Sequence, residues 1–358
     1  MTEGYSIEAF RGDYEALERM AHASWRDEYG EASFPNFYRP AFLRYLIDRI
    51  PGEKRDHVVA AYRGDKIIAF FLNLPQSFSL EGKIRRGVYS CLLVTRREDY
   101  RRGVALAVIR RALEISRSYD YDFSLFTLET GHRSTRMMAK VAVEGRMERI
   151  RKTGVVARIL DFPRAVYSEG LKGYETAALR LIGAHRPPRR KGLLPIRKYR
   201  PSDLDGCLAL LAKYQRTLRL ALVWDREELG WELDCPDVSQ TLVYEKDGRL
   251  AGLVNFILHD HLGRSVERWA WVNHLAFPGL PPEERAAFIR SYLVAVQDAG
   301  FAGTVEWKRR NYPVRTLYRN RFFPYPRGVN QMSWTFNPDL SLAEIPDVYE
   351  IQIGRAHV

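Results

Sequence analysis

Residues 92–105 read Leu-Leu-Val-Thr-Arg-Arg-Glu-Asp-Tyr-Arg-Arg-Gly-Val-Ala, an apolar strand pattern that runs through a basic loop into the start of a helix. The start of a helix directs unpaired backbone N–H groups and the positive end of the helix dipole at one point. Gly103 lets the backbone approach a ligand closely, and the small Ala105 keeps the helix start uncrowded. Arg101 or Arg102 can add charge-assisted hydrogen bonds. The stretch therefore predicts a pyrophosphate-binding site.

The residues on either side of this stretch predict the same order of elements twice. Each half contains a helix, a hairpin, a third strand, a long amphipathic helix and a further strand. We interpret the repetition as a domain duplication within an α/β (α+β) fold. The paired segments are the helices at 14–23 and 204–211, the hairpins at 57–74 and 240–258, the third strands at 88–94 and 269–277, the amphipathic helices at 104–118 and 283–299, and the last strands at 123–128 and 304–307.

An aspartate precedes the first helix of each half, Asp13 in one and Asp203 in the other. A carboxylate at that position can accept hydrogen bonds from the unpaired N–H groups of the first helical turn. We therefore expect both residues to cap their helices.

The segment between the two halves contains a stretch where regular structure is not expected. Residues 185–192 read His-Arg-Pro-Pro-Arg-Arg-Lys-Gly, and adjacent prolines oppose both helix and sheet. Its run of charge suits a solvated connector better than a contact with an acidic partner. We predict an N-terminal domain over 1–164, a basic linker over 165–195, a C-terminal domain over 196–340 and a tail over 341–358.

The loop at residues 100–105, Tyr-Arg-Arg-Gly-Val-Ala, resembles the pyrophosphate loop of the GNAT family of coenzyme A-dependent N-acyltransferases, which has the form Arg/Gln-x-x-Gly-x-Gly/Ala. Tyr100 stands where the family prefers Arg or Gln, and Arg101 beside it can supply the missing charge. With the duplication, the chain resembles tandem-GNAT proteins, and more loosely acetyltransferases of the enhanced-intracellular-survival type. This resemblance implies two GNAT-like domains in tandem, each a mixed, mostly antiparallel sheet flanked by helices.

A second landmark lies in the other half, where residues 311–323 are similar to the family's last helix. The resemblance implies that Tyr318 protonates the departing thiolate. In the first half, His132 takes the place of the Asn that contacts the cofactor arm, and Ala139 takes the place of the Tyr. The second half's counterpart of the phosphate loop, residues 277–285, contains three prolines and two glutamates, which remove N–H donors and repel phosphate. We therefore expect the first half to bind acyl-coenzyme A and the second to complete the acceptor pocket.

The family's two central strands splay apart, and the thioester lies in the gap between them. The resemblance therefore implies catalytic residues on the strands near 88–94 and 128. Glu129 is the predicted base, directly or through water, although a helix-capping or surface carboxylate is an equal alternative. Tyr89 is a candidate acid or a pocket-lining residue. The implied cofactor is acetyl-coenzyme A, held by Leu93, Val94, Tyr100, Arg101, Arg102, Gly103, Val104, Ala105 and His132.

The cysteines and histidines do not predict a metal site. Cys91 shares a strand face with Tyr89, and a buried small hydrophobe is favoured over a nucleophile because no histidine lies nearby in sequence. His259 and His261 follow a strand and precede Gly263, so we expect a polar loop there, since a third ligand at recognisable spacing is missing. We expect no metal.

Composition limits the class of protein. The 358 residues include three cysteines, with no close pair, and no apolar run near the roughly 18 residues that a spanning helix needs. We expect a cytoplasmic, reduced protein, neither embedded in a membrane nor a secreted precursor. The net charge of +12 comes from 45 arginines and 11 lysines against 44 acidic residues. It suits a polyanion or a general compositional bias equally well, so nucleic acid is a possible partner but not the favoured one.

The leading hypothesis is an N-acetyltransferase that moves acetyl from acetyl-coenzyme A to a primary amine by direct attack. The acceptor is a small molecule or an amino group of a larger one. One alternative is an aminoacyl-tRNA-dependent transferase, since such enzymes also resemble tandem GNAT copies and the positive charge suits an RNA backbone. The other is a non-catalytic module that binds coenzyme A or nucleic acid.

Overall fold

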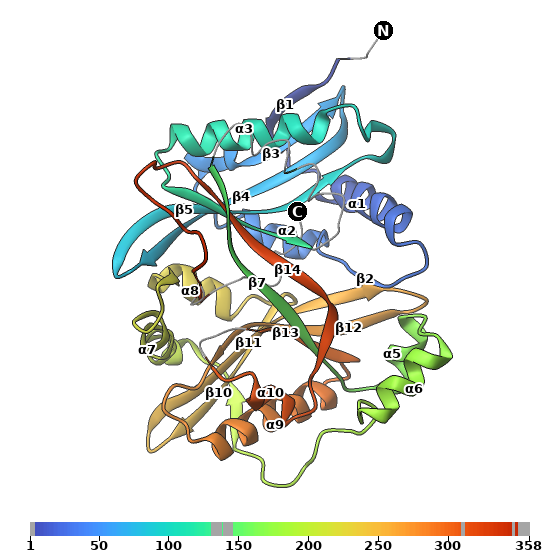
Figure 1. Cartoon of the computed structure of the whole chain (residues 1–358), viewed down its shortest axis with the longest axis vertical. Helices are drawn as coiled ribbons and strands as arrows, with labels where there is room; N and C mark the ends of the chain where they lie inside the picture. Colours follow the sequence, from blue (N-terminus) through green and yellow to red (C-terminus); the bar gives the residue numbers. More distant parts are fainter. Residues whose placement is uncertain (1–3, 130–137, 139–145, 309–311, 346–347, 350–358) are drawn as a thin grey trace.

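The computed structural model of the chain describes residues 4–129, 138, 146–308, 312–345 and 348–349. One large sheet of mostly antiparallel strands runs through both halves of the molecule, with helices on its faces (Figure 1). Its main path has the order β1-β3-β4-β5-β6-β14-β7-β13-β12-β11-β10-β8, with β2, β9 and β15 attached to the side of that path. Among the described helices, none is long and apolar enough to cross a bilayer.

The first half supplies strands β1 to β7 and helices α1 to α3. The strands are β1 (Ser6–Ala9), β2 (Phe34–Pro35), β3 (Val58–Arg63), β4 (Lys66–Leu80), β5 (Lys83–Thr95), β6 (Phe123–Glu129) and β7 (Arg146–Ile159). The helices are α1 (Tyr14–Tyr29), α2 (Pro40–Ile47) and α3 (Val104–Ser118), and the short 3-10 turns are η1 (Gly52–His57) and η2 (Arg97–Asp99). Helices α5 (Phe162–Ser168) and α6 (Gly173–Leu181) follow β7.

The second half repeats the pattern. Its strands are β8 (Ile196–Lys198), β9 (Leu220–Val223), β10 (Ser239–Lys246), β11 (Arg249–Leu262), β12 (Val266–Ala276), β13 (Gly303–Trp307), β14 (Phe323–Thr335) and β15 (Val348–Tyr349). Its helices are α7 (Leu204–Gln215), α8 (Arg226–Leu233), α9 (Pro282–Asp298) and α10 (Arg315–Tyr318), and the turn η4 (Pro201–Asp203) precedes α7.

Helices on opposite faces of the sheet enclose separate cores. On one face, α1 and α2 of the first half and α7 and α8 of the second pack into one continuous apolar cluster that crosses from half to half. On the other face, α3 and α9 each cover a cluster of their own half. Helix α3 does so because Val104, Val108, Ala112 and Ile115, spaced three or four apart, form one buried side. The shared core therefore joins the two halves.

Two strands cross between the halves. Strand β14 lies between β6 and β7, pairing with β6 from Val329↔Glu129 to Thr335↔Phe123. Strand β7 in turn pairs with β13, from Gly303↔Ile159 to Trp307↔Val155. In Figure 1 the two strands run together through the middle of the molecule. The sheet of each half therefore contains a strand from the other half.

The predicted order of elements is confirmed. Both hairpins form, and α3 covers the predicted residues 104–118. Within the predicted linker, α6 forms at 173–181, and residues 185–195 contain no helix or strand. The expectation for Asp203 is wrong: Asp13 accepts from the backbone N–H of Ala16 and caps α1, but the Asp203 carboxylate accepts from Arg197 and from the backbone N–H of Arg200 instead. A nearby guanidinium outcompetes the helix for this carboxylate.

Candidate acyl-coenzyme A site

The predicted gap between β5 and β6 is present. The two strands run parallel and are in register over three pairs, Gly87↔Phe123, Val88↔Ser124 and Tyr89↔Leu125, and no further pair joins them. At the first pair the two strands approach closely. A Cβ atom added to Gly87 would lie 2.9 Å from the Phe123 ring. Past Tyr89, the edge of β5 that faces β6 is therefore available to an extended ligand arm.

A β-bulge distorts β5 beside this gap. The register with β4 jumps from Cys91↔Leu72 to Val94↔Phe70, and Leu92 has a φ of 55°. A bulge leaves backbone groups out of the ladder and redirects the strand. Leu92 is buried, Leu93 is half-buried and Val94 is buried, so the predicted contacts at Leu93 and Val94 come from a kinked backbone at the gap.

The loop after β5 is held by an internal ion pair. The carboxylate of Asp99 is buried and lies 2.5 Å from the guanidinium of Arg63, with Arg102 3.8 Å away. The backbone N–H groups of Asp99 and Tyr100 close two turns onto Arg96 and Arg97. A buried, charge-assisted hydrogen bond of this kind fixes the loop ahead of the helix.

Helix α3 begins where the sequence predicts, and its first turn is open. Gly103 is the N-cap with a φ of 81°, and Arg101 also has a positive φ, 64°. Within the described chain no side chain caps this helix, and a Cβ atom on Gly103 would meet nothing within 4 Å. Arg101 and Arg102 are exposed. The helix start thus lies beside two exposed cations and, among the described residues, has no side-chain cap, an arrangement suited to a phosphate.

Two of the predicted catalytic residues lie on the same face of the gap. The hydroxyl of Tyr89, which is buried, lies 3.1 Å from the hydroxyl of Thr127 on β6. Glu129 comes two residues later on β6, so it shares the face of Thr127, and it is 8% exposed. Cys91 is fully buried, as expected of a small hydrophobe. The sequence had not indicated Thr127.

Other predicted site residues lie elsewhere. Tyr318 is in α10, which packs beside α9 at the end of the molecule opposite α3 (Figure 1), and it is 40% exposed. The structure does not bring it to the β5–β6 gap. His132, Ala139 and Asn311 lie outside the described residues.

Tyr38 was missed by the sequence analysis. It is 1% exposed, and within the described residues its hydroxyl has no hydrogen-bond partner. Burial raises its pKa well above the ordinary value, and Cys91 and Tyr100 act in the same direction, which places Tyr38 near both β5 and the loop. No sequence signal could have found it, because the contact joins segments about fifty residues apart.

The matching region of the second half has a different chemistry. Helix α9 begins at Pro282 after Pro281, and neither proline has an N–H group to donate. The two acidic residues of its first turn are occupied within the chain: Glu283 lies 3.0 Å from Arg319 and Glu284 2.7 Å from Lys246. The start of α9 therefore has fewer backbone N–H donors than the start of α3, and two carboxylates already lie there.

His259 and His261 do not lie in a polar loop, contrary to our expectation. Both belong to β11, and His259 is fully buried with its ring against Phe37, Phe42 and Trp271. Burial lowers its pKa well below the ordinary value. Within the described residues, no group of three His, Cys, Asp or Glu side chains could hold a metal ion.

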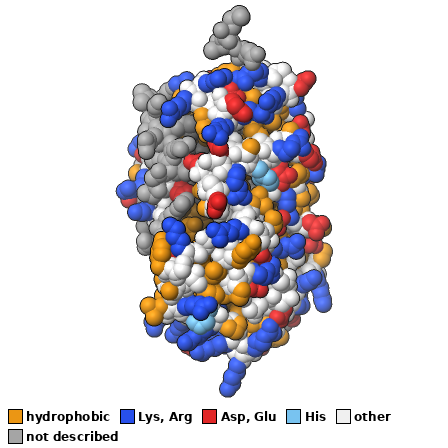
Figure 2. Space-filling model, turned by 90° about the vertical axis from the view of Figure 1, so that its right-hand side faces the viewer, with side chains coloured by type: hydrophobic (Ala, Val, Ile, Leu, Met, Phe, Trp, Pro, Cys, Tyr) orange, Lys and Arg blue, Asp and Glu red, His pale blue; other side chains and the backbone are white. Residues whose placement is uncertain are grey.

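On the face of the molecule drawn in Figure 2, the positive charge of the described residues is not concentrated at one site. Figure 2 shows Lys and Arg side chains distributed from top to bottom of the face in view, with acidic side chains among them. Several arginines are paired within the chain, such as Arg190 with Asp298 and Arg219 with Glu81. The charge of these arginines is balanced locally by carboxylates of the same chain.

Comparison with known proteins identifies the fold. No protein-family model and no curated protein sequence matches the chain. Among solved structures, Saccharomyces cerevisiae N-myristoyltransferase with bound myristoyl-CoA matches 97% of this chain and 88% of its own, with a TM-score of 0.76 and 14% identity. GCN5-related N-acetyltransferases from Kribbella flavida and Anabaena variabilis match 93% and 92% of this chain and 72% of their own, with TM-scores of 0.51 and 0.55 and identities of 14% and 10%.

At these identities the likeness is one of fold. The chain has the tandem GNAT fold over almost its whole length, as the loop at residues 100–105 and the duplication predict. The proteins that share the fold include acyl-coenzyme A N-acyltransferases, one of them N-myristoyltransferase. The looser link to the enhanced-intracellular-survival type stays a prediction.

Proposed function

We propose that this protein is an acyl-coenzyme A-dependent N-acyltransferase whose donor site is in the first half. One observation carries the proposal: the β5–β6 gap and the open N-terminus of α3 are joined by the single loop at 96–103. The helix start receives the pyrophosphate, and the free edge of β5 pairs with the pantetheine arm. A thioester at the end of that arm then lies beside Tyr89 and Glu129.

Direct transfer follows from this arrangement. The nitrogen of a neutral primary amine attacks the thioester carbonyl, so that a C–N bond forms and the C–S bond breaks. Glu129 accepts the proton that the amine loses, directly or through a water molecule, and Tyr89 donates a proton to the departing thiolate. Backbone N–H groups at the Leu92 bulge polarise the carbonyl oxygen. The acceptor is a small amine or an amino group of a larger molecule.

We propose acetyl as the acyl group. The side of the sheet beside the gap that faces α1 and α2 is filled by Tyr38, Cys91 and Leu92, each at most 1% exposed and all within one apolar cluster. Side chains packed this closely leave little room behind a thioester unless they move. A donor with two carbons needs no such movement.

A longer acyl chain is the second candidate, and one finding favours it. The chain agrees better in fold with N-myristoyltransferase carrying myristoyl-CoA, at a TM-score of 0.76, than with the two acetyltransferases, at 0.51 and 0.55. Rates with acetyl-, octanoyl- and myristoyl-coenzyme A and one amine acceptor distinguish the two. A preference for myristoyl would overturn the assignment of acetyl and leave the reaction class intact.

Calorimetry with acetyl-coenzyme A tests the donor site. Gly103→Glu places a carboxylate where the pyrophosphate would bind, and Gly103→Gln imposes the same backbone strain without the charge. We expect the Glu variant to bind at least about 100-fold more weakly than the Gln variant, or about 3 kcal/mol at 1.4 kcal/mol per tenfold. Failure of the parent protein to bind any acyl-coenzyme A would rule out the proposal.

Turnover of bound donor tests the proposed base. Glu129→Gln removes the proton acceptor and preserves the shape of the side chain, so we expect kcat to fall by about 100-fold or more with donor affinity within twofold. Unchanged kcat in Glu129→Gln would remove Glu129 from the mechanism, and donor binding with no turnover on any amine would favour a non-catalytic module.

A further inference from the structure

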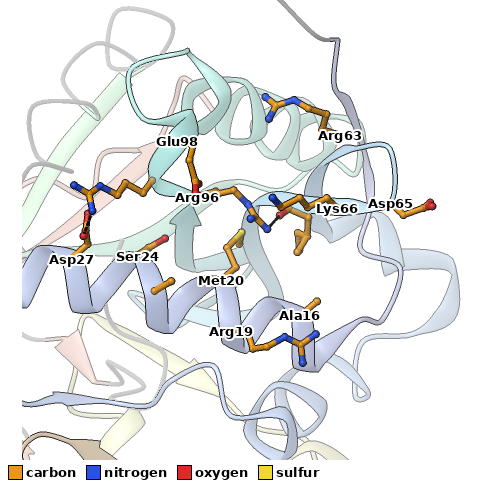
Figure 3. A pocket seen from close by; sticks show the side chains of 13 residues that line it. Ala16, Arg19, Met20, Ser24, Asp27, Arg63, Asp65, Lys66, Arg96 and Glu98 are labelled. Carbon is orange, nitrogen blue, oxygen red and sulfur yellow. Dashed lines mark hydrogen bonds and ion pairs between the residues drawn. The ribbon is translucent and has the colours of Figure 1, made fainter.

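A cavity of about 820 Å³ lies in the first half, apart from the β5–β6 gap. It is bounded by α1, by the turn between β3 and β4, and by the start of the loop that follows β5 (Figure 3). Its volume falls in the range of small-molecule sites and exceeds what a single inorganic ion needs. None of the residues assigned to the donor site from Tyr100 to Ala105 lines it.

Three cations from three separate segments line this cavity without a carboxylate partner. Arg19 comes from α1, Lys66 is the first residue of β4, and Arg96 directly follows β5, and within the described residues none of them is ion-paired. One Arg96 nitrogen donates to the carbonyl of Ile67 at 3.0 Å, whereas its Nε is buried and has no hydrogen-bond partner among the described residues. Figure 3 shows Arg96 and Lys66 on the sheet side and Arg19 on the helix side.

The other charged groups at the cavity are largely paired. Arg63 is bound to the buried Asp99, and Arg97 is bound to Asp27. Asp65 lies 3.4 Å from Arg11. Glu98 is the lining carboxylate that has no ion pair within the described residues, and it is exposed. The three unpaired cations therefore outnumber the unpaired anions.

Apart from Ser24, whose hydroxyl donates to the carbonyl of Thr95, the rest of the lining is apolar. Ala16, Met20 and Ala23 are spaced four and three residues apart, so they lie along one side of α1. Ile67, which is buried, contributes from β4. A pocket with an apolar wall and several unpaired cations in its lining fits a ligand with an apolar or aromatic body and a strongly anionic group.

We propose that this cavity binds a small molecule through a phosphate group, held by Arg19, Lys66 and Arg96, with the body of the molecule against α1. Two sources of the phosphate fit this chemistry. One is the ribose phosphate of coenzyme A, and this source rests on the proposed function. The other is a separate phosphorylated molecule. Because Arg96 begins the loop that ends at Gly103, either occupant contacts the loop that holds the donor.

Matched variants at Ala23 test the site. This residue is exposed, lines the cavity and lies inside α1, where glutamate and glutamine are both good helix formers. Ala23→Glu places a negative charge in the cavity, and Ala23→Gln fills the same space without it. The probes for calorimetry on the full chain are coenzyme A, dephospho-coenzyme A and adenosine 3′,5′-bisphosphate.

The two sources give different results. If the donor's ribose phosphate occupies the cavity, coenzyme A binds at least tenfold tighter than dephospho-coenzyme A to the parent and to Ala23→Gln, and this preference disappears in Ala23→Glu. If a separate phosphorylated molecule occupies the cavity, adenosine 3′,5′-bisphosphate still binds to the parent when dephospho-coenzyme A is present at saturating concentration. Ala23→Glu then weakens the binding of adenosine 3′,5′-bisphosphate at least tenfold. Equal affinities of Ala23→Glu and Ala23→Gln for every probe would overturn the proposal.

The cavity can be tested even if the proposed function is wrong. A parent protein that binds no acyl-coenzyme A can still be titrated with adenosine 3′,5′-bisphosphate alone. Binding lost in Ala23→Glu and retained in Gly103→Glu assigns it to the cavity, whereas the reverse assigns it to the start of α3. As a second route, Arg19→Gln combined with Lys66→Gln should weaken the same probe, and Arg111→Gln combined with Lys83→Gln, away from the cavity, should not.

Discussion

The two halves of the molecule contain the same gap built in two ways. In the first half, β5 and β6 are in register over three parallel pairs from Gly87↔Phe123, and in the second half β12 and β13 are in register over three from Trp269↔Gly303. Each gap therefore begins at a glycine facing an aromatic ring, but the glycine is on the first strand in one half and on the second strand in the other. The gap is therefore a property of the fold and does not depend on which of the two strands contains the glycine.

The helix that follows each gap determines what the gap can bind. Helix α3 starts after Gly103 beside two exposed arginines and, among the described residues, has no side-chain cap, whereas α9 starts at Pro282 with two glutamates already bound to Lys246 and Arg319. Phosphate affinity depends on N–H groups and positive charge at the helix start. The two halves thus differ at a few loop residues, and this difference suits the first half to an acyl donor and leaves the second half available to an acceptor.

Alanine at the two glycines tests whether the gaps have equivalent beginnings. A Cβ atom on Gly303 would lie 2.3 Å from the Trp269 ring, and one on Gly87 2.9 Å from the Phe123 ring. Because both rings are buried, we expect Gly303→Ala to lower the free energy of unfolding by about 3 kcal/mol and Gly87→Ala by about 1–2 kcal/mol, as for overpacked cores. Urea unfolding followed by tryptophan fluorescence measures both.

Gly173 provides the control for that series. It has an ordinary φ, and a Cβ atom there would meet nothing within 4 Å, so Gly173→Ala should leave stability nearly unchanged. If Gly87→Ala destabilises the protein more than Gly303→Ala, the beginnings of the two gaps are packed differently from what the close approaches indicate. Of the two substitutions, only Gly87→Ala should also weaken the binding of acetyl-coenzyme A, since Gly87 lies beside the proposed donor site.

Much of this arrangement is local and could be predicted from the sequence. The start of α3 at Val104 follows from Gly103, and the β3–β4 hairpin follows from the turn at Arg63-Gly64-Asp65, because both depend on neighbouring residues. The same is true of the prolines before α9. The resemblance of residues 100–105 to a phosphate loop needs only six consecutive residues.

What could not be predicted depends on distant segments. Strand β14 lies between β6 and β7, and its partners, such as Glu129 for Val329 and Arg146 for Thr335, are far away in the sequence. The alternation of apolar and polar residues along a strand does not indicate which strand it pairs with. The buried pair of Asp99 and Arg63 fixes the donor loop from another hairpin. His259 resembled a loop residue because its burial comes from Phe37 and Phe42 of the other half.

The smallest expected effect concerns the two aspartates that the sequence treats alike. Asp13 caps α1 by accepting from Ala16, whereas Asp203 is bound by Arg197 at 2.7 and 2.9 Å. The hydrogen bond from Arg197 holds the pKa of Asp203 below its ordinary value. A carboxylate with a lowered folded-state pKa stabilises the protein above its unfolded pKa near 4, and that contribution is lost as the pH falls through the folded value.

We therefore expect Asp203→Asn to lower Tm by about 2 °C at pH 7, since this pair is partly exposed and solvent weakens it. The difference from the parent should shrink below about pH 4, where the parent's own carboxylate becomes protonated. Asp13→Asn should change Tm less, because asparagine is also a good helix cap. Thermal unfolding from pH 3 to 8 measures this, and a pH-independent loss in Asp203→Asn would show that its role is packing and not charge.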